Sequence, residues 1–480
     1  MFAIDRSSTV PLADQIEARL RALVEGAQLP AGARLPSIRQ LAAQLHVSPN
    51  TVVTAYDRLV AAALIDSRST AGFFVREGEA ALPDASLLEA GDEQDPVWLA
   101  QQANDQRAGV LPASSGALPA SWLEDAIPAA VVQRALARSP GGMAARCPPQ
   151  GLPELRERLA MLMRGQGIAV DANRVLTTYG GTHAIDLICR SFLQPGDTVL
   201  VENPGYFLLF GRLRQAGVRI VPIARRADGP DLAQIEAACV EQRPRLAFIQ
   251  SVLHNPTGWG SSAANLHRLL LLAERHDMLL AEDDVQGHFH PGPATRLAQL
   301  SGLQRVIYYS SFCKALSPAL RLGYIAAEPA LLKPLLREKI FSILTTAALN
   351  EYVLLELLAA GRWRKHLDRL QQKLGVARGA AARRLREAGI ALDQPGEGGL
   401  FLWGSVPDGV DIDLLVKDAY RNQILLARGA TFMADGRTDP HIRFNVVFSQ
   451  HQRLADHLAQ RLGALSSVRS TLARFAARAD

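Results

Sequence analysis

From about residue 174 onward, short apolar runs of strand length alternate with helical segments, and this alternation limits the possible folds most strongly. The strand candidates are Arg174–Thr178, Thr198–Glu202, Arg219–Pro222, Leu246–Gln250, Met278–Glu282 and Val306–Ser310. Strands separated by helices form parallel sheets that are buried on both faces. The pattern therefore predicts an α/β domain with a mostly parallel sheet. Beyond about Ala330, long helices and then strands predict a smaller α+β lobe, mainly over residues 345–480.

The composition places the chain among multidomain globular proteins. At 480 residues it is too long for one core, and about three folding units are expected. Hydrophobic residues make up 48% and charged residues 21%, which excludes a largely disordered chain. The net charge of +5 permits contact with nucleic acid without requiring it.

The cysteines and the apolar runs bear on the cellular compartment. Four cysteines without a CxxC pair indicate reduced thiols, not a disulfide frame or a zinc knuckle. The N-terminus lacks the apolar core of a signal peptide, and no apolar run reaches membrane length. We therefore expect a cytoplasmic protein with no membrane partner.

The first 77 residues have the pattern of a winged helix-turn-helix, an α+β fold. Helical spacing of apolar residues occurs over residues 11–26 and 36–45, and a third helix is expected from Ser48, a plausible N-cap. Two short helices joined by a tight turn present the second helix to the major groove of DNA. Residues 64–75 alternate like a hairpin with a small polar tip, which suits a wing. The alternative is a helical dimerisation domain.

Residues 78–107 separate this module from the rest of the chain. Periodicity fades and acidic residues accumulate there, namely Asp84, Glu89, Asp92, Glu93 and Asp95. We expect an acidic, mobile linker, with a short helix around Val97–Gln102. Its charge discourages contact with DNA.

Lysine is rare in this chain, and the first lysine, Lys314, lies in a distinctive segment. It follows Ser311 closely and precedes Arg321 by seven residues. Lysine is the side chain that condenses with an aldehyde cofactor, and its pKa is readily lowered by its surroundings. Arginine is suited to bind a phosphate. The segment predicts a Schiff-base site beside a phosphate-binding group.

Other polar motifs follow the predicted strands, where ligands of open α/β sheets gather. Thr178–His183 opens a helix whose N–H groups suit a phosphate, and Glu202–Tyr206 places an aromatic ring past the next strand. His254–Gly258 directs an amide inward, and Glu282–Asp284 supplies a carboxylate that could keep a pyridine nitrogen protonated. Each motif alone has a structural explanation as a turn, a core ring or a helix cap. Together, at successive strand ends, they favour a cofactor site.

A metal site is not predicted. His288 and His290 lie near Asp283 and Asp284 in the sequence, but no third ligand at a suitable spacing supports metal binding.

With these motifs the chain resembles a known family. Residues 1–76 resemble the GntR-type winged helix, and residues 108–480 resemble a fold-type I aminotransferase that uses pyridoxal 5′-phosphate. This fusion is the signature of the MocR/GabR group of bacterial transcriptional regulators. The motifs that carry the resemblance are Leu35-Pro36-Ser37-x-Arg39-x-Leu41-Ala42, Val47-Ser48-x-Asn50-Thr51-Val52, Asn255-Pro256-Thr257-Gly258, Glu282-Asp283-Asp284, Ser311-Phe312-x-Lys314 and Arg321-x-Gly323.

The resemblance implies roles for residues around the cofactor ring. Lys314 would attach the cofactor aldehyde, and Asp283 would pair with the pyridine nitrogen. Tyr206 would stack on the ring, and Asn255 would face the ring hydroxyl. Gln286 occupies the position from which a tyrosine usually reaches the same hydroxyl.

It also implies binding sites for the phosphate, for an effector and for DNA. Gly181, Thr182, Ser311 and Arg321 would hold the phosphate, and Arg443 would hold the carboxylate of a substrate or effector. The residues expected to contact DNA are Arg39, Ser48, Asn50, Thr51 and, in the wing, Arg68 and Gly72.

The chain differs from the family pattern at several positions. Cys147 replaces a tyrosine that often reaches the phosphate of the neighbouring subunit, and Cys313 replaces a common serine. With Gln286, these changes remove hydroxyl donors and weaken cofactor binding by about 1–3 kcal/mol each if nothing replaces them. Pro49 and Val53 stand in the recognition helix where related proteins often carry arginine.

The N-terminal module has a small charge excess. Residues 1–76 hold eight arginines against six acidic residues. Such an excess is low for phosphate binding, so we expect a dimer that presents two modules to a repeated site.

These features predict a homodimeric, ligand-responsive regulator of promoter DNA that senses pyridoxal phosphate or an amine or amino acid that reacts with it. One alternative is an active aminotransferase with a vestigial N-terminal domain. Another is a regulator whose aminotransferase-like domain has lost the cofactor and serves only for dimerisation.

Overall fold

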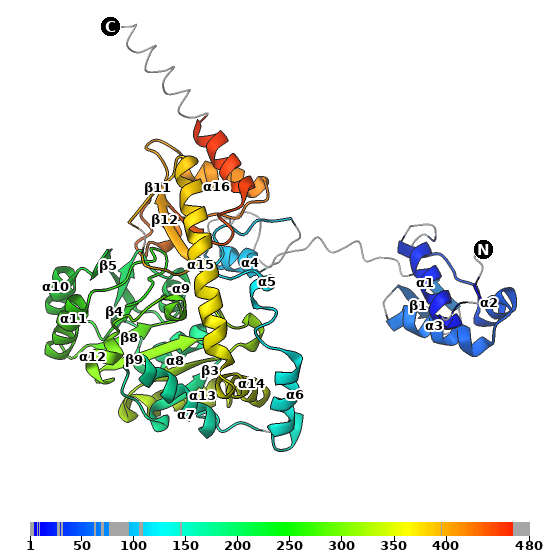
Figure 1. Ribbon diagram of the computed structural model, residues 1–480, viewed down its shortest axis with the longest axis horizontal. Coiled ribbons are helices and arrows are strands. Elements are labelled where there is room, and N and C mark those ends of the chain that lie inside the picture. The colour runs from blue at the N-terminus through cyan, green and yellow to red at the C-terminus, as the bar shows by residue number, and fades with distance from the viewer. Residues whose placement is uncertain are drawn as a thin grey trace, which may run out of the picture. The chain divides into compact units, whose positions relative to one another are not determined.

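The computed structural model describes residues 4–6, 8, 10–25, 29, 32–61, 64–68, 72–75, 96–104, 109–144, 146–394 and 396–463. They form two compact units, one within Met1–Gly91 and one within Asp92–Asp480 (Figure 1). Each unit has its own hydrophobic core.

The N-terminal unit consists of three helices and an antiparallel hairpin. Its core includes Ile16 and Val52, both fully buried. The side chain of Ser37 accepts a hydrogen bond from the Gln40 N–H at the start of the second helix, and His46 ends that helix with a φ of 51°. The elements are α1 (Leu12–Glu25), α2 (Ile38–Leu45), α3 (Pro49–Ala61), β1 (Ile65–Arg68) and β2 (Gly72–Val75).

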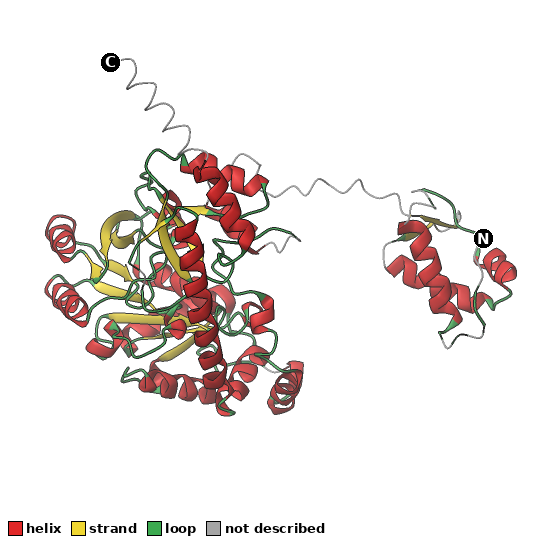
Figure 2. Ribbon diagram, turned by 45° about the horizontal axis from the view of Figure 1, so that its top comes forward, coloured by secondary structure: helices red, strands yellow, loops and turns green. Residues whose placement is uncertain are grey.

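The second unit is built on an eight-stranded sheet with the order β3-β10-β9-β8-β7-β4-β5-β6. Figure 2 shows strands in yellow among the red helices of this unit. The five strands from β9 to β5 are parallel, whereas β10 runs antiparallel to both β9 and β3, and β6 runs antiparallel to β5. The strands are β3 (Val175–Thr178), β4 (Thr198–Asn203), β5 (Arg219–Arg226), β6 (Gly229–Pro230), β7 (Leu246–Ile249), β8 (Leu279–Asp283), β9 (Val306–Ser311) and β10 (Gly323–Ala326).

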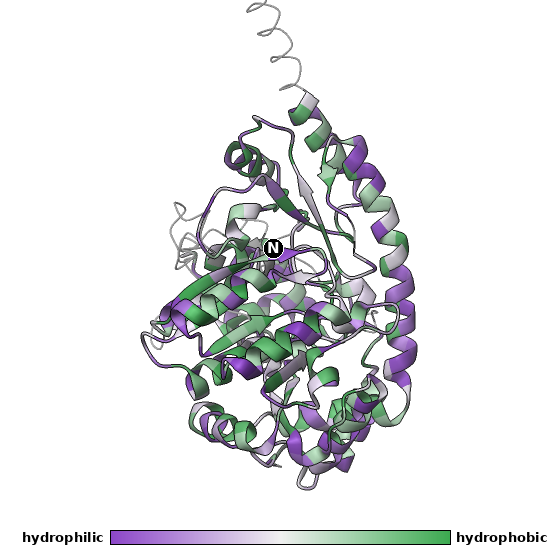
Figure 3. Cartoon of the chain, turned by 90° about the vertical axis from the view of Figure 1, so that its left-hand side faces the viewer, coloured by the Kyte–Doolittle hydropathy of each residue, from purple (hydrophilic) through white to green (hydrophobic). Residues whose placement is uncertain are grey.

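Helices cover both faces of this sheet. Along β4, Leu200 belongs to one core cluster and Val199 and Val201 to the other, because successive strand side chains point to opposite faces. One face packs on α8 (Gly180–Phe192), α9 (Phe207–Gln215) and α13 (Pro329–Ile343). The other packs on α7 (Pro153–Gly165), α10 (Leu232–Gln242), α11 (Ala263–Arg275), α12 (Leu297–Ser301) and α14 (Ala348–Ala359). Figure 3 shows the central strands largely in the hydrophobic colour.

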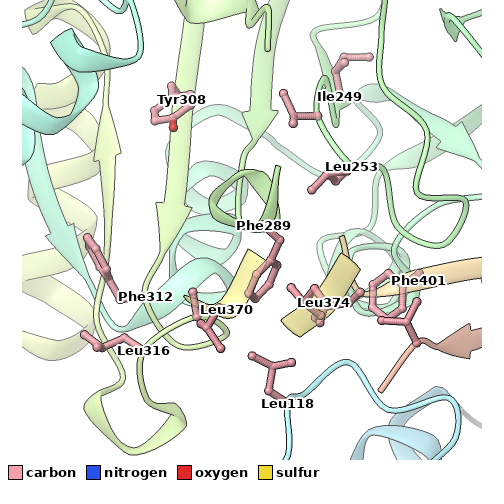
Figure 4. Packing of buried hydrophobic residues seen from close by; sticks show 14 of the residues in the cluster. Leu118, Ile249, Leu253, Phe289, Tyr308, Phe312, Leu316, Leu370, Leu374 and Phe401 are labelled. Carbon is pink, nitrogen blue, oxygen red and sulfur yellow. The ribbon is translucent and has the colours of Figure 1, made fainter. Parts of the chain in front are cut away.

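A smaller lobe follows the long helix α15 (Arg362–Glu387). Its antiparallel sheet has the order β11-β12-β14-β13, with α16 (Ile412–Arg421) beside it. Figure 4 shows Leu370 and Leu374 of α15 near Phe289 in the larger core cluster. The strands are β11 (Ala391–Leu392), β12 (Phe401–Ser405), β13 (Ala427–Arg428) and β14 (His441–Asn445).

Three further helices of the second unit come before α7 in the chain: α4 (Pro96–Asn104), α5 (Ala120–Leu123) and α6 (Ala129–Arg138). The ring of Trp98 in α4 lies 5.1 Å from that of Tyr420 in α16, and the Tyr420 hydroxyl donates to Gln102 over 3.0 Å. The helix expected within the linker is therefore present, and it belongs to the second unit, where it packs on α16.

Each of the six predicted strands is present, and the fold class is as predicted. The predicted linker residues 78–95 and 105–107 lie outside the described part of the chain. Within the described part, no helix is long and apolar enough to cross a membrane.

Candidate functional site

A cavity of about 640 Å³ lies where the parallel strands end. Because the carboxyl ends of parallel strands meet at one edge of the sheet, the motifs that follow them converge there. All of the residues that the sequence predicts for the cofactor and effector line this cavity, namely Gly181, Thr182, Tyr206, Asn255, Asp283, Gln286, Ser311, Lys314, Arg321 and Arg443.

Lys314 projects into this cavity from the loop after β9. A Cβ atom at Gly116 would lie 3.5 Å from Lys314 Nζ, so the glycine leaves the amine accessible. Among the described residues, none forms a hydrogen bond or ion pair with this amine. Burial, together with the nearby charges of Arg443 and Arg321, lowers the pKa of Lys314 to about 8. A large fraction of the amine is therefore neutral under mildly alkaline conditions.

The turn between β3 and α8 forms a cradle for an anion. Gly180 has a φ of +76°, and a Cβ atom there would lie 3.1 Å from Cys313 Sγ, 3.4 Å from Ser311 Oγ and 3.6 Å from Arg321 Nη2. Any other residue would crowd these groups. Thr182 stands in the first turn of α8, where N–H groups and the helix dipole favour negative charge.

Of the three consecutive carboxylates at the end of β8, only Asp283 lines the cavity. Its Oδ1 accepts the Val285 N–H over 2.9 Å, and the side chains of Tyr309 and Gln250 also donate to it. Burial raises the pKa of Asp283 to about 6, although these hydrogen bonds oppose the shift. The carboxylate is thus shielded from water and prepared to share a proton with a ligand.

The other two carboxylates stabilise the fold. Glu282 accepts the N–H groups of Leu297 and Ala298 at the start of α12, over 2.7 and 2.8 Å. Asp284 pairs with Arg296 Nε over 2.9 Å and accepts the Tyr308 hydroxyl over 2.6 Å.

Gln250, which the sequence analysis did not select, holds two site residues in place. Its Oε1 accepts the Asn255 N–H over 2.8 Å, and its side chain donates to Asp283. The buried pair Glu202–Arg225 holds its backbone, since the Gln250 N–H donates to Glu202 over 2.7 Å and its carbonyl accepts from Arg225 over 3.1 Å. The only feature of the sequence that could have indicated this role is the position of Gln250 directly after β7.

Arg443 on β14 lies between two aromatic rings. Its guanidinium carbon is 4.4 Å from the ring centre of Phe401 and 4.6 Å from that of Phe432. Nη1 donates to Asn255 Oδ1 over 2.8 Å, and Nη2 donates to the Ser114 carbonyl over 2.6 Å. Nε is buried without a partner in the described structure. Burial lowers the pKa of Arg443 to about 9.

Two further predicted residues line the cavity from opposite loops. Tyr206, at the start of α9, has a hydrogen bond to the Thr182 side chain, and burial raises its pKa to about 12. The Gln286 side chain is buried, and its Oε1 lacks a partner among the described residues.

The two histidines near these carboxylates do not form a metal site. The described residues contain no group of three or more His, Cys, Asp or Glu side chains that could hold an ion. His288 stacks on Phe312 with ring centres 5.4 Å apart, and burial lowers its pKa to about 4.

In the N-terminal unit, the start of α3 presents polar side chains. Ser48 accepts the Thr51 N–H over 3.2 Å, so it caps the helix as predicted. Ser48, Asn50 and, on α2, Arg39 are exposed. This arrangement leaves the first turn of α3 free to enter a groove.

A further exposed arginine, Arg34, lies beside the hairpin of β1 and β2. The side chain of Arg34, which sequence reasoning missed, lies 3.7 Å from the position of a Cβ atom at Gly72. Arg68 ends β1, and its side chain is outside the described structure. Arg58 is paired with Asp14, so it contributes less to a basic surface.

Comparison with known proteins agrees with both parts of this description. Residues 110–462 match the model for aminotransferase class I and II. The chain belongs to this aminotransferase family. Residues 12–75 match the gntR family of bacterial regulatory proteins, so the aminotransferase domain is fused to a GntR helix-turn-helix domain. This fusion makes the chain a MocR-type transcriptional regulator.

Relatives named as regulators are similar to most of this MocR-type chain. The probable rhizopine catabolism regulatory protein MocR of Rhizobium meliloti is 30% identical over 78% of this chain and 76% of its own length. The HTH-type transcriptional regulator YisV of Bacillus subtilis is 25% identical over 92% of this chain and 94% of its own length.

Among solved structures, the MocR-type chain is similar to LysN, the alpha-aminoadipate aminotransferase of Thermus thermophilus, complexed with N-(5′-phosphopyridoxyl)-L-leucine. The TM-score is 0.70 and the identity 26%, over 77% of this chain and 95% of LysN. The fold-type I architecture expected from the sequence is therefore confirmed.

Of the three differences from the family that fall in the aminotransferase domain, two lie in the cavity of this MocR-type chain and one does not. Cys313 and Gln286 line the cavity. Cys147 does not line it; burial and a hydrogen bond to Glu351 raise its pKa to about 12. It belongs to a buried cluster in which Lys339 Nζ donates to Thr177 Oγ1 over 3.1 Å.

Proposed function

We propose that this regulator is a homodimer that binds pyridoxal 5′-phosphate at Lys314 and changes its affinity for promoter DNA when an amine or amino acid occupies the same cavity. The observation that carries the proposal is the accessible amine of Lys314, without a partner among the described residues, beside an anion cradle, a buried carboxylate and a buried guanidinium.

The cavity fits a phosphorylated aromatic aldehyde. Gln286 Oε1 and Arg443 Nε are buried polar atoms without partners among the described residues, and such atoms are costly unless a ligand or water satisfies them. The cradle around Gly180 is of a size and charge suited to a phosphate. Bound pyridoxal phosphate would supply an aldehyde for amine capture and a ring that accepts electrons.

Each side chain has a proposed role toward that group. Neutral Lys314 would hold the group through its aldehyde, and Asp283 would keep a proton on the pyridine nitrogen. Tyr206 would stack on the ring, while Asn255 and Gln286 would orient the ring hydroxyl.

The remaining polar groups of the cavity bind anions. Ser311, Thr182, Arg321 and the N–H groups at Gly181 would hold the phosphate. Arg443 would bind an effector carboxylate through charge-assisted hydrogen bonds. The hydrogen bond from Arg443 to Asn255, 2.8 Å long, supports an effector site next to the ring site.

The N-terminal unit is proposed to bind double-stranded promoter DNA. Ser48, Asn50 and Thr51 would enter the major groove, and Arg39 would contact the phosphate backbone. Arg68 and Gly72 belong to the proposed wing. A dimer would present two such surfaces to a repeated site.

The test is DNA binding by the full-length protein with and without pyridoxal phosphate. We expect the affinity for a mapped promoter site to change by about tenfold, which corresponds to a coupling free energy of about 1.4 kcal/mol. Sedimentation of the complex should give two chains. Equal affinity under both conditions would contradict the proposal.

The second candidate function is an active aminotransferase. The likeness to LysN supports it, as do Lys314, Asp283 and Arg443 in one cavity. Rapid turnover between amino acids and 2-oxo acids, without any response of DNA affinity, would favour this candidate. A third possibility, a domain without cofactor, predicts no covalent capture of pyridoxal phosphate at any pH.

A further inference from the structure

The cavity that holds Lys314 also has an extensive apolar wall. Six side chains form it, from α4, from the segment around α5 and from the region of α9: Leu99, Leu118, Leu123, Ile127, Phe207 and Leu208. Pyridoxal phosphate and a carboxylate account for Lys314, Arg321, Arg443 and Asp283, but no proposed role so far uses this wall.

The charges in the cavity restrict what can lie against the apolar wall. Among the described lining residues, the cations are Lys314, Arg321 and Arg443, and each already has a proposed partner. The acidic lining residues are Asp283, at the ring site, and Glu124, which is exposed. A second carboxylate on the ligand would find no free cation among them, and Glu124 would repel it. Burying an unpaired charge is costly.

Helix α4 contributes directly to the wall. Leu99 is 7% exposed and Ala100 also lines the cavity, whereas the neighbouring Trp98 and Gln102 contact Tyr420 of α16. The helix thus touches the ligand cavity with one side and the small lobe with another; Figure 1 labels it next to α5. In sequence, it is also the first described element after the DNA-binding unit.

We infer that the effector is an amino acid with one carboxylate and an apolar side chain, aliphatic or aromatic, which packs against Leu99 of α4 and the rest of the apolar wall. This inference rests on the proposed function, since Arg443 holds the carboxylate and Lys314 holds the cofactor. Removal of the ligand's apolar surface from water supplies the affinity, and absence of a fourth cation among the described lining residues excludes dicarboxylic amino acids.

The experiment is calorimetric titration of the full-length protein loaded with pyridoxal phosphate. The probes are L-leucine, L-phenylalanine, L-glutamate and L-lysine. We expect L-leucine or L-phenylalanine to bind at least about tenfold more tightly than the two charged amino acids, a ratio equivalent to about 1.4 kcal/mol.

Two variants test the contacts. Leu99→Ala should weaken the binding of the apolar amino acid by about fivefold to tenfold, because it removes part of the wall. Val97→Ala, on the same helix but 51% exposed, is the matched control and should leave the affinity unchanged. Glu124→Lys, at an exposed position that does not threaten folding, should increase the affinity for L-glutamate by about tenfold.

The outcomes separate this inference from the proposed function. Tighter binding of L-glutamate or L-lysine, no binding of any of the four probes, or no effect of Leu99→Ala in a folded variant would overturn the inference. Cofactor absorbance, recorded in the same samples, reports on the proposed function. A protein that fails to retain pyridoxal phosphate contradicts that function, whereas a retained cofactor with the wrong ligand preference contradicts only the inference.

Discussion

At the scale of single residues, surroundings decide what a carboxylate or an amine does. Glu282, Asp283 and Asp284 are adjacent in sequence, yet one caps a helix, one lines the cavity and one neutralises a buried arginine. The strand sends alternate side chains to opposite faces, so neighbours in sequence enter different environments. Their substitutions should therefore have different consequences.

Asp284→Asn should lower the free energy of unfolding by about 3 kcal/mol, because it leaves the Arg296 charge buried without a carboxylate. Asp283→Asn is the matched comparison. Burial raises the pKa of Asp283 to about 6, so its charged form costs stability at pH 7 and loss of the charge should not destabilise the fold. Denaturant unfolding followed by fluorescence measures the free energy of unfolding of both variants. Equal destabilisation would contradict the different roles given to Asp283 and Asp284.

Lys314 should capture pyridoxal phosphate in a pH-dependent manner. Burial lowers its pKa to about 8, so the neutral, reactive amine increases as pH rises and the capture rate should level off above about pH 8. If the pKa of Lys314 were not lowered, the capture rate would still be rising at about pH 10. Lys314→Ala should abolish the label fixed by borohydride and detected by mass spectrometry. Lys333→Ala, at an exposed site on α13, should retain it.

At the scale of elements, α2 and α3 present their polar side chains because their apolar sides are used in the core. Leu41, Val52 and Tyr56 are buried, whereas Arg39 and Asn50 are exposed. The same division applies to α4, which buries Trp98 and Leu99 and exposes Val97.

Arg39→Ala should weaken DNA binding uniformly across sequences and reduce the slope of log affinity against log salt concentration by about 0.9, as expected for one lost phosphate contact. Arg19→Ala removes the same charge from an exposed position on α1 and is the control. Fluorescence anisotropy over a range of salt concentrations measures the slope. An equal effect of both substitutions would mean that general charge, not a contact by Arg39, is responsible.

At the scale of the whole molecule, the chain combines two units that each have a separate core. A ligand stabilises only the unit that binds it. Calorimetric unfolding of the full-length protein should therefore show a transition of the second unit that moves to higher temperature with pyridoxal phosphate. At about one hundred times the dissociation constant, the stabilisation should be about 2.7 kcal/mol. A shift of the N-terminal transition instead would contradict the assignment of the cofactor to the second unit.

Much of this molecule follows from local sequence alone. Periodicities of two and 3.6 residues locate the six predicted strands and the three helices of the N-terminal unit, since these depend on which side chains face a core. Ser48 could be assigned as a cap because capping involves residues only three positions apart. The fold class follows from the alternation of strands and helices, and the carboxyl ends of the parallel strands indicate where a ligand binds. The ten cavity residues were named from the resemblance to a family, and one of them, Arg443, lies on β14 outside the parallel sheet.

Tertiary structure decided the rest, because those features depend on pairs of residues that are far apart in the chain. The four-residue strand β10 lies between β3 and β9, and its own sequence carries no sign of these partners. Gln250 is held in place by Glu202 and Arg225, which are distant in sequence. Helix α4 lines the cavity because it packs against α9 and α16. Local sequence patterns determine which residues form helices, strands and strand ends, whereas long-range packing determines which of these residues come into contact.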